Sequence, residues 1–187
     1  MTFKIQVGTP IAKYSKRKEY SFDEALQNIF LLHTENVIIY WNYCCIPLDY
    51  KYTISDIFND ILTMLESLTN QEEGEKVVTF FENSFHTKWL MTWDKNNLTI
   101  IAEWYSVSGA EEMLNILTQR NKIIINKSLF ISEWKMLLST VKNNLLKYYL
   151  HARVINGFDK LISIEKKIKN KGCFYTKNSA LSQNLNK

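Results

Sequence analysis

The sequence predicts an α+β fold: a mainly antiparallel sheet with a central hairpin, packed against two or three helices that include a long C-terminal helix. Two tryptophan-rich segments between residues 86 and 105 alternate apolar and polar side chains, which is the period of a half-buried strand. Residues 54–68 and 130–148 instead repeat apolar side chains at helical spacing. Because the 187 residues include only 5 Gly and 2 Pro, we expect one ordered domain over residues 1–187.

The N-terminal segment predicts one strand and one helix. Phe3–Val7 alternates apolar and polar residues, as expected of a half-buried strand. Ser21 and Glu24 have the spacing of a capping box, in which each side chain binds a backbone N–H of the first helical turn. We therefore expect a helix over residues 22–33.

A second strand and helix follow. Residues 37–43 are dominated by β-branched and aromatic side chains, which favours a central strand, and Pro47 is expected to end it. Thr53 or Ser55 can then cap a helix. The apolar side chains of this helix should form one stripe, which consists of Ile54, Phe58, Ile61, Leu62, Leu65 and Leu68.

The strongest pattern in the chain is that of a hairpin. Residues 86–93 and 98–105 both alternate, and the tetrapeptide Asp94–Asn97 between them is rich in turn-forming residues. The preceding residues 76–85 fit either a strand or a short helix. One face of the hairpin should be apolar, with Trp89, Met91, Trp93, Leu98, Ile100, Ala102 and Trp104.

The C-terminal part is expected to be mostly helical. Residues 110–117 predict a short helix, and residues 122–126 predict a strand. Ser128 opens a helix whose apolar residues keep a 3.6-residue rhythm as far as Tyr148, so this helix should pack across the sheet. Residues 158–187 should form a basic amphipathic helix followed by a frayed tail.

The net charge of +4 conceals an uneven distribution along the chain. Residues 1–48 carry a net charge of +1, residues 49–112 carry −8, and residues 113–187 carry +11. The acidic middle segment should attract a cationic protein and repel nucleic acid, or else it serves only to keep the protein soluble. The lysines of the C-terminal third could neutralise phosphates, but they are spread around helices whose aromatic residues the core needs, which is more typical of a solvated face.

No local pattern points to catalysis, a metal site or a cofactor. The three histidines and three cysteines lack the spacing of metal ligands, and there is no glycine-rich phosphate loop or nucleophile elbow. Two alternatives depend on the tertiary fold: Cys44 as a nucleophile beside a histidine, and Asp56 with Asp60 as paired carboxylates. We expect a protein that is not an enzyme.

The sequence also predicts a cytoplasmic protein without a membrane partner. No apolar run approaches the length of a membrane-spanning helix, and the N-terminal 20 residues contain no apolar core of a signal peptide. Cys44, Cys45 and Cys173 are an odd set in which two are adjacent, so we expect reduced thiols.

The chain resembles the small α/β immunity proteins of bacterial polymorphic toxin and contact-dependent growth inhibition systems. The resemblance covers about residues 36–150 and lies in the order of a tryptophan-rich hairpin, a polar loop, a short strand and a final long helix. Its residues are Trp93-Asp94, Asn97-Leu98-Thr99-Ile100, Ala102-Glu103-Trp104, Phe130, Glu133-Trp134 and Leu137-Leu138. It implies a cytoplasmic inhibitor that sequesters a cognate toxin C-terminal domain, frequently a nuclease. It transfers no catalytic residue, because such proteins act by occlusion.

A nuclease needs a basic groove, so an acidic patch is the expected partner-binding surface. This hypothesis names Asp56, Asp60, Glu66, Glu72 and Glu73. Trp104 and Tyr105 are further candidates as exposed anchors, or else belong to the core. A homodimer is left open. The alternative function is that of a nucleic-acid-binding or regulatory protein that uses the lysine-rich C-terminal helices.

Overall fold

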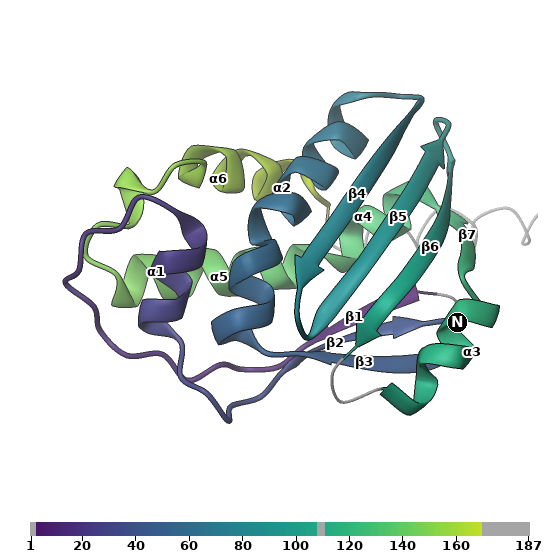
Figure 1. Cartoon of the computed structure of the whole chain (residues 1–187). Helices are drawn as coiled ribbons and strands as arrows, with labels where there is room; N and C mark the ends of the chain where they lie inside the picture. Colours follow the sequence, from purple (N-terminus) through teal and green to yellow (C-terminus); the bar gives the residue numbers. More distant parts are fainter. Residues whose placement is uncertain (1–2, 108–110, 170–187) are drawn as a thin grey trace, which may run out of the picture.

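The computed structural model describes residues 3–107 and 111–169 as an α+β fold with two antiparallel sheets (Figure 1). The strands are β1 (Phe3–Val7), β2 (Val37–Trp41), β3 (Cys44–Leu48), β4 (Gly74–Glu82), β5 (Phe85–Trp93), β6 (Asn97–Val107) and β7 (Lys122–Asn126). The α-helices are α1 (Phe22–Ile29), α2 (Ser55–Asn70), α3 (Leu114–Gln119), α4 (Lys127–Glu133), α5 (Lys135–Tyr148) and α6 (Phe158–Lys167). A π-helical turn, Tyr50–Ile54, leads into α2, and the 3-10 turns Glu111–Met113 and Ala152–Val154 precede α3 and α6.

The three-stranded sheet has the order β1-β2-β3, so β2 is central, as predicted. The prediction of one strand over residues 37–43 was wrong, because the chain turns back at Asn42 and Tyr43 and Trp41 pairs with Cys44. Both turn residues have positive φ angles, 45° and 72°, as a tight two-residue hairpin turn requires. Pro47 does not end the strand: it lies within β3, an edge strand, where a residue without an N–H is tolerated.

The four-stranded sheet has the order β4-β5-β6-β7 and contains the predicted hairpin. The carboxylate of Asp94 accepts hydrogen bonds from the backbone N–H groups of Asn96 (2.7 Å) and Asn97 (2.8 Å), which closes the turn between β5 and β6. These bonds hold the pKa of Asp94 below its usual range. The ambiguous residues 76–85 belong mostly to strand β4.

Trp89 lies where the two sheets and α4 meet. The centroid of its indole ring is 5.2 Å from that of Trp41, 4.9 Å from that of Phe80, 6.3 Å from that of Phe3 and 6.5 Å from that of Phe130. These five rings come from β1, β2, β4, β5 and α4. All of them are buried, so one aromatic cluster joins the inner faces of both sheets.

The helix ends differ from the predictions in ways that hydrogen bonds explain. Helix α1 stops at Ile29, because the carbonyl of Ile29 accepts the N–H of Lys13 and a bridge between Ala12 and Phe30 follows. The predicted caps of α2 were wrong: Asp49 caps the π-helical turn ahead of it, and its side chain accepts from the N–H groups of Tyr52 and Thr53.

The predicted long C-terminal helix is two helices, α4 and α5, which meet at Trp134. Asn126 caps α4 in place of Ser128, because its side-chain oxygen accepts the N–H of Leu129 at 3.1 Å. The buried carboxylate of Glu133 accepts the N–H of Ile5 at 2.8 Å, so α4 satisfies a backbone donor of edge strand β1.

Helix α6 confirms the helical part of the predicted C-terminal segment. Gly157, at φ 86°, precedes it. Residues 108–110, which include the start of the predicted short helix, and residues 170–187 of the predicted tail lie outside the described residues.

The hairpin turn at Tyr43 yields a stability prediction. A side chain at φ 72° crowds its own backbone, and glycine avoids that cost. Tyr43→Gly should therefore have a free energy of unfolding about 1 kcal/mol higher than Tyr43→Ala, as measured by urea denaturation. Comparing the two variants removes the contribution of the tyrosine ring, which both lack. Equal stability of the two would show that the turn is not strained.

Candidate functional site

The outer face of the four-stranded sheet carries a set of exposed apolar side chains. Alternate residues of β4, β5 and β6 point into the core, and the residues between them point outward. Figure 1 shows α4 and the three-stranded sheet behind β4–β6, and no described helix in front of them. We call this surface the outer sheet face and define it by Val77, Phe81, His86, Leu90, Ile101 and Tyr105.

Three aromatic rings lie in a row across one end of the outer sheet face, and we call this row the aromatic stack, although its Phe81 and His86 rings meet edge-on. His86 lies between Phe81 and Tyr105, with ring centroids 4.6 Å and 4.5 Å away. Phe81 is 77% exposed and Tyr105 is 50% exposed. The register shifts here: His86 pairs with Ser106 and Thr87 pairs with Trp104. Tyr105 is thus the extra residue of a β-bulge, which aims its ring at His86.

An aliphatic row crosses the same face four residues further along the strands. Val77 of β4 pairs with Leu90 of β5, which pairs with Ile101 of β6. All three side chains are exposed. The outer sheet face therefore carries two clusters on three neighbouring strands, one aliphatic and one aromatic, and exposed apolar clusters often mark protein–protein contact sites.

A polar row separates the aromatic stack from the aliphatic row. Lys88 and Glu103 lie opposite each other and form an ion pair at 3.5 Å. The hydroxyl of Tyr105 donates to Glu103 at 2.6 Å. This hydrogen bond lowers the pKa of Glu103 and raises the pKa of Tyr105.

The structure divides the residues that the sequence singled out for partner binding. Tyr105 belongs to the outer sheet face, whereas Trp104 is in the core, at 8% exposure, against Trp41. Glu72 and Glu73 are exposed in the turn before β4, whose first outward side chain is Glu75. Asp56, Asp60 and Glu66 are on α2, away from this group.

The carboxylates of α2 are engaged with neighbouring helices. Gln27 of α1 donates to Asp56 at 2.7 Å. Lys160 of α6 forms an ion pair with Glu66 at 2.6 Å. Burial raises the pKa of Asp60. Some acidic side chains of residues 49–112 are thus paired with basic side chains of residues 113–187 inside the fold, because α6 packs beside α2.

Two further lysines of the basic third are paired inside the fold. Glu165 of α6 forms ion pairs with Lys135 (3.2 Å) and Lys142 (3.1 Å) of α5, and Ser139 donates to it at 2.8 Å. Burial acts to raise the pKa of Glu165, but these hydrogen bonds outweigh burial and the pKa is lowered. These lysines join α5 to α6.

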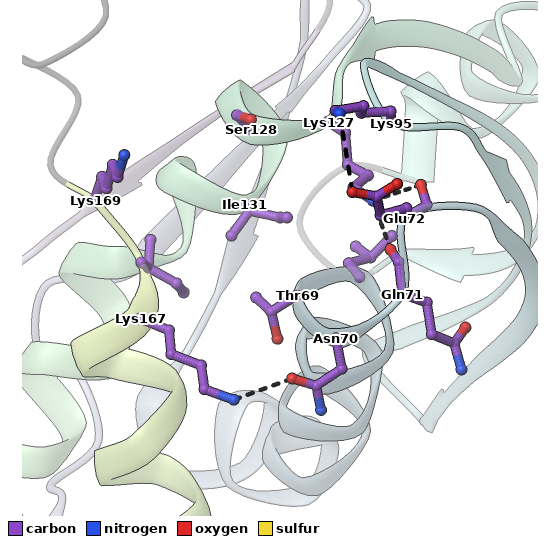
Figure 2. Close-up of a pocket in the computed structure, with 12 residues that line it drawn as sticks. Thr69, Asn70, Gln71, Glu72, Lys95, Lys127, Ser128, Ile131, Lys167 and Lys169 are labelled. Atoms are coloured by element: carbon purple, nitrogen blue, oxygen red, sulfur yellow. Dashed lines mark hydrogen bonds and ion pairs between the residues drawn. The ribbon is translucent and has the colours of Figure 1, made fainter.

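A cavity of about 450 Å³ opens where α2 ends (Figure 2). It lies between the ends of α2 and α6, the start of α4 and the turn between β5 and β6. The lining residues are Leu68, Thr69, Asn70, Gln71, Glu72, Lys95, Lys127, Ser128, Ile131, Lys167, Ile168 and Lys169. The sequence did not indicate this cavity, because its lysines come from three distant segments.

Lys127 closes one side of the cavity. It is 8% exposed, and its ammonium group donates to the carbonyls of Gln71 (2.7 Å) and Glu72 (3.0 Å) at the end of α2. Burial lowers the pKa of Lys127, while the charges of Glu72 and Asp94 act in the opposite direction. A cation at the carbonyl end of a helix is favourable.

The described residues contain no group of three or more His, Cys, Asp or Glu side chains that could hold a metal ion. Cys44 is buried, and burial raises its pKa despite the opposing charge of Arg120. Cys45 is exposed, and Cys173 lies outside the described residues. Within residues 3–107 and 111–169, every helix is too short or too polar to cross a membrane.

Comparison of the chain with protein-family models, with curated proteins and with solved structures found no match. The function must therefore be inferred from the surfaces described above.

Asp60 provides a test of the α2 surface. Burial raises the pKa of Asp60 in the folded state. At a pH above that pKa, the ionised carboxylate therefore lowers the free energy of unfolding. This penalty is absent below the pKa of Asp60 in the unfolded chain, which is about 3.9. Asp60→Asn should raise the free energy of unfolding at pH 7 by a few tenths of a kcal/mol, since solvent screens this half-buried group. The gain should vanish near pH 3. Glu73→Gln, at an exposed position outside the helices, is the matched control.

Proposed function

We propose that the protein is a cytoplasmic immunity protein, which binds a cognate bacterial toxin domain and neutralises it by occlusion. The observation that carries the proposal is the outer sheet face, with its aromatic stack and aliphatic row. Aromatic side chains in a central position, ringed by polar groups, are the usual anchors of tight protein–protein interfaces. The resemblance to immunity proteins supplies the class of partner.

The outer sheet face suits tight binding because it is held rigid before contact. Its side chains stand on three hydrogen-bonded strands, and Glu103 fixes the hydroxyl of Tyr105. Little conformational entropy is then lost when a partner covers the face. Phe81 and Tyr105 are the proposed anchors.

Charge at the border of this face would give the complex its selectivity. Glu72, Glu73 and Glu75 lie at the start of β4, next to the aliphatic row. Such a negative rim accelerates association with a basic toxin groove. Asp56, Asp60 and Glu66 remain the competing acidic face, on α2.

The nucleic-acid alternative has less support. It requires lysines that are free of carboxylate partners on the C-terminal helices, and three of those lysines, Lys135, Lys142 and Lys160, are paired with carboxylates. An exposed apolar face with a negative border favours a protein partner.

The proposal predicts which substitutions weaken toxin binding. Co-expression with the C-terminal toxin domain encoded beside the gene should restore host growth and give a one-to-one complex. Phe81→Ala and Tyr105→Ala should each raise the Kd by about thirtyfold, since each removes an anchor worth about 2 kcal/mol. The measurement is titration calorimetry with the purified domain. Tyr14→Ala is the matched control, because Tyr14 is 54% exposed outside this face.

Charge reversal shows which of the two acidic surfaces contacts the toxin. Replacing Glu72 and Glu73 by Lys should slow association several-fold at low salt, and the effect should fade as salt rises. Loss of binding only on reversal of Asp56, Asp60 and Glu66 would move the interface to α2. Failure of the unmodified protein to bind or protect would refute the proposed function.

A further inference from the structure

We infer that the cavity at the end of α2 binds a small phosphate-bearing anion. Four lysines line it: Lys95 from the β5–β6 turn, Lys127 from α4, and Lys167 and Lys169 from α6 and the residues that follow it. Glu72 is the single carboxylate among the lining residues. Positive charges around a cavity repel one another, and a bound anion offsets this repulsion.

The lysines around this cavity have weak internal partners. Lys95 is 3.9 Å from Glu72, and both side chains are at least 74% exposed. Lys167 donates to the neutral amide oxygen of Asn70 at 3.0 Å. By contrast, the lysines that serve the fold lie 3.1–3.2 Å from the carboxylate of Glu165. The charge at the cavity is therefore available to a ligand.

Lys127 supplies a fixed donor at the wall of the cavity. An ammonium group has three N–H donors, and Lys127 uses two of them on the carbonyls of Gln71 and Glu72. The other three lysines are exposed at the rim, and Figure 2 shows Lys167 reaching towards Asn70 and Lys95 towards Glu72, while Lys169 points away from them. One buried and three exposed ammonium groups suit a ligand with several anionic oxygens.

The lining defines the class of ligand. A volume of about 450 Å³ lies within the range of small-molecule sites, which is roughly 300–1,000 Å³. Phosphate groups provide several acceptor oxygens and more than one negative charge, which matches three or four ammonium groups. No aromatic ring is among the described lining residues, so there is no platform on which a base could stack. Phosphate groups should account for most of the affinity.

This site adjoins the border of the proposed toxin interface, because Glu72 lines the cavity and also belongs to the acidic rim. It uses none of the anchors of the outer sheet face. Variants of the cavity lysines and variants of Phe81 or Tyr105 therefore test the two proposals separately.

The test uses inorganic tripolyphosphate and the full chain. Titration calorimetry at low ionic strength should detect binding to one site, and Lys95→Gln/Lys167→Gln/Lys169→Gln should weaken it by at least about tenfold. Lys127 is left intact because it caps α2. The matched control is Lys13→Gln/Lys16→Gln/Lys18→Gln, which removes the same charge at three exposed positions and should change the Kd less than about twofold.

Adding ATP as a second probe tests the ligand class. ATP should bind no more tightly than tripolyphosphate, because the cavity has no stacking surface. Absence of tripolyphosphate binding, or equal weakening by the two triple variants, would overturn the inference. Much tighter binding of ATP would overturn it as well, since recognition would then depend on the nucleoside. Unchanged thermal unfolding of both variants confirms that the fold is retained.

Discussion

The fold depends on packing tryptophan rings between two sheets. Trp89 contacts aromatic rings from both sheets and from α4, and the core around it is close to fully buried. The indole N–H groups of Trp89, Trp104 and Trp134 are buried without a hydrogen-bond partner among the described residues. Each such donor costs about 1–3 kcal/mol, so the apolar area of the rings must outweigh the loss.

This packing also determines which surface is left for binding. In an antiparallel sheet, successive side chains point to opposite faces, so using Trp89, Met91 and Trp93 for the core directs Leu90 and its row outward. The core covers one face of the four-stranded sheet and leaves the other exposed. Apolar side chains on that second face contribute little to folding, which is why we assign them to a partner.

Buried charged groups connect the elements around this core. Glu133 satisfies a donor of edge strand β1, and Lys127 satisfies two carbonyls at the end of α2. Glu165 holds α5 and α6 together through two lysines. In each case a charged side chain replaces water at backbone or side-chain groups that packing would otherwise leave unpaired.

Periodicity predicted the elements well where one face is buried. The β5–β6 hairpin and the stripe of α2 follow directly from side-chain spacing. The turn between β2 and β3 was missed because Asn42-Tyr43 lacks the glycine that usually marks such turns. The break at Trp134 was missed because the helical rhythm continues across it.

The sites were harder to predict than the fold. Tyr105 was singled out as an aromatic residue, but its stacking on His86 depends on a bulge that exists only once β5 and β6 pair. The cavity lysines meet only in the tertiary structure, and the pairing of Glu66 with Lys160 spans α2 and α6. The net charge of a sequence segment does not indicate which of its charged side chains meet in the fold.

The bond between Ile5 and Glu133 joins positions 128 residues apart. During synthesis, the first strand leaves the ribosome long before the helix that completes its edge. Glu133 can therefore satisfy the N–H of Ile5 only after the segment that contains α4 has been made. The long sequence separation of these two positions makes completion of this edge a slow, non-local step of folding.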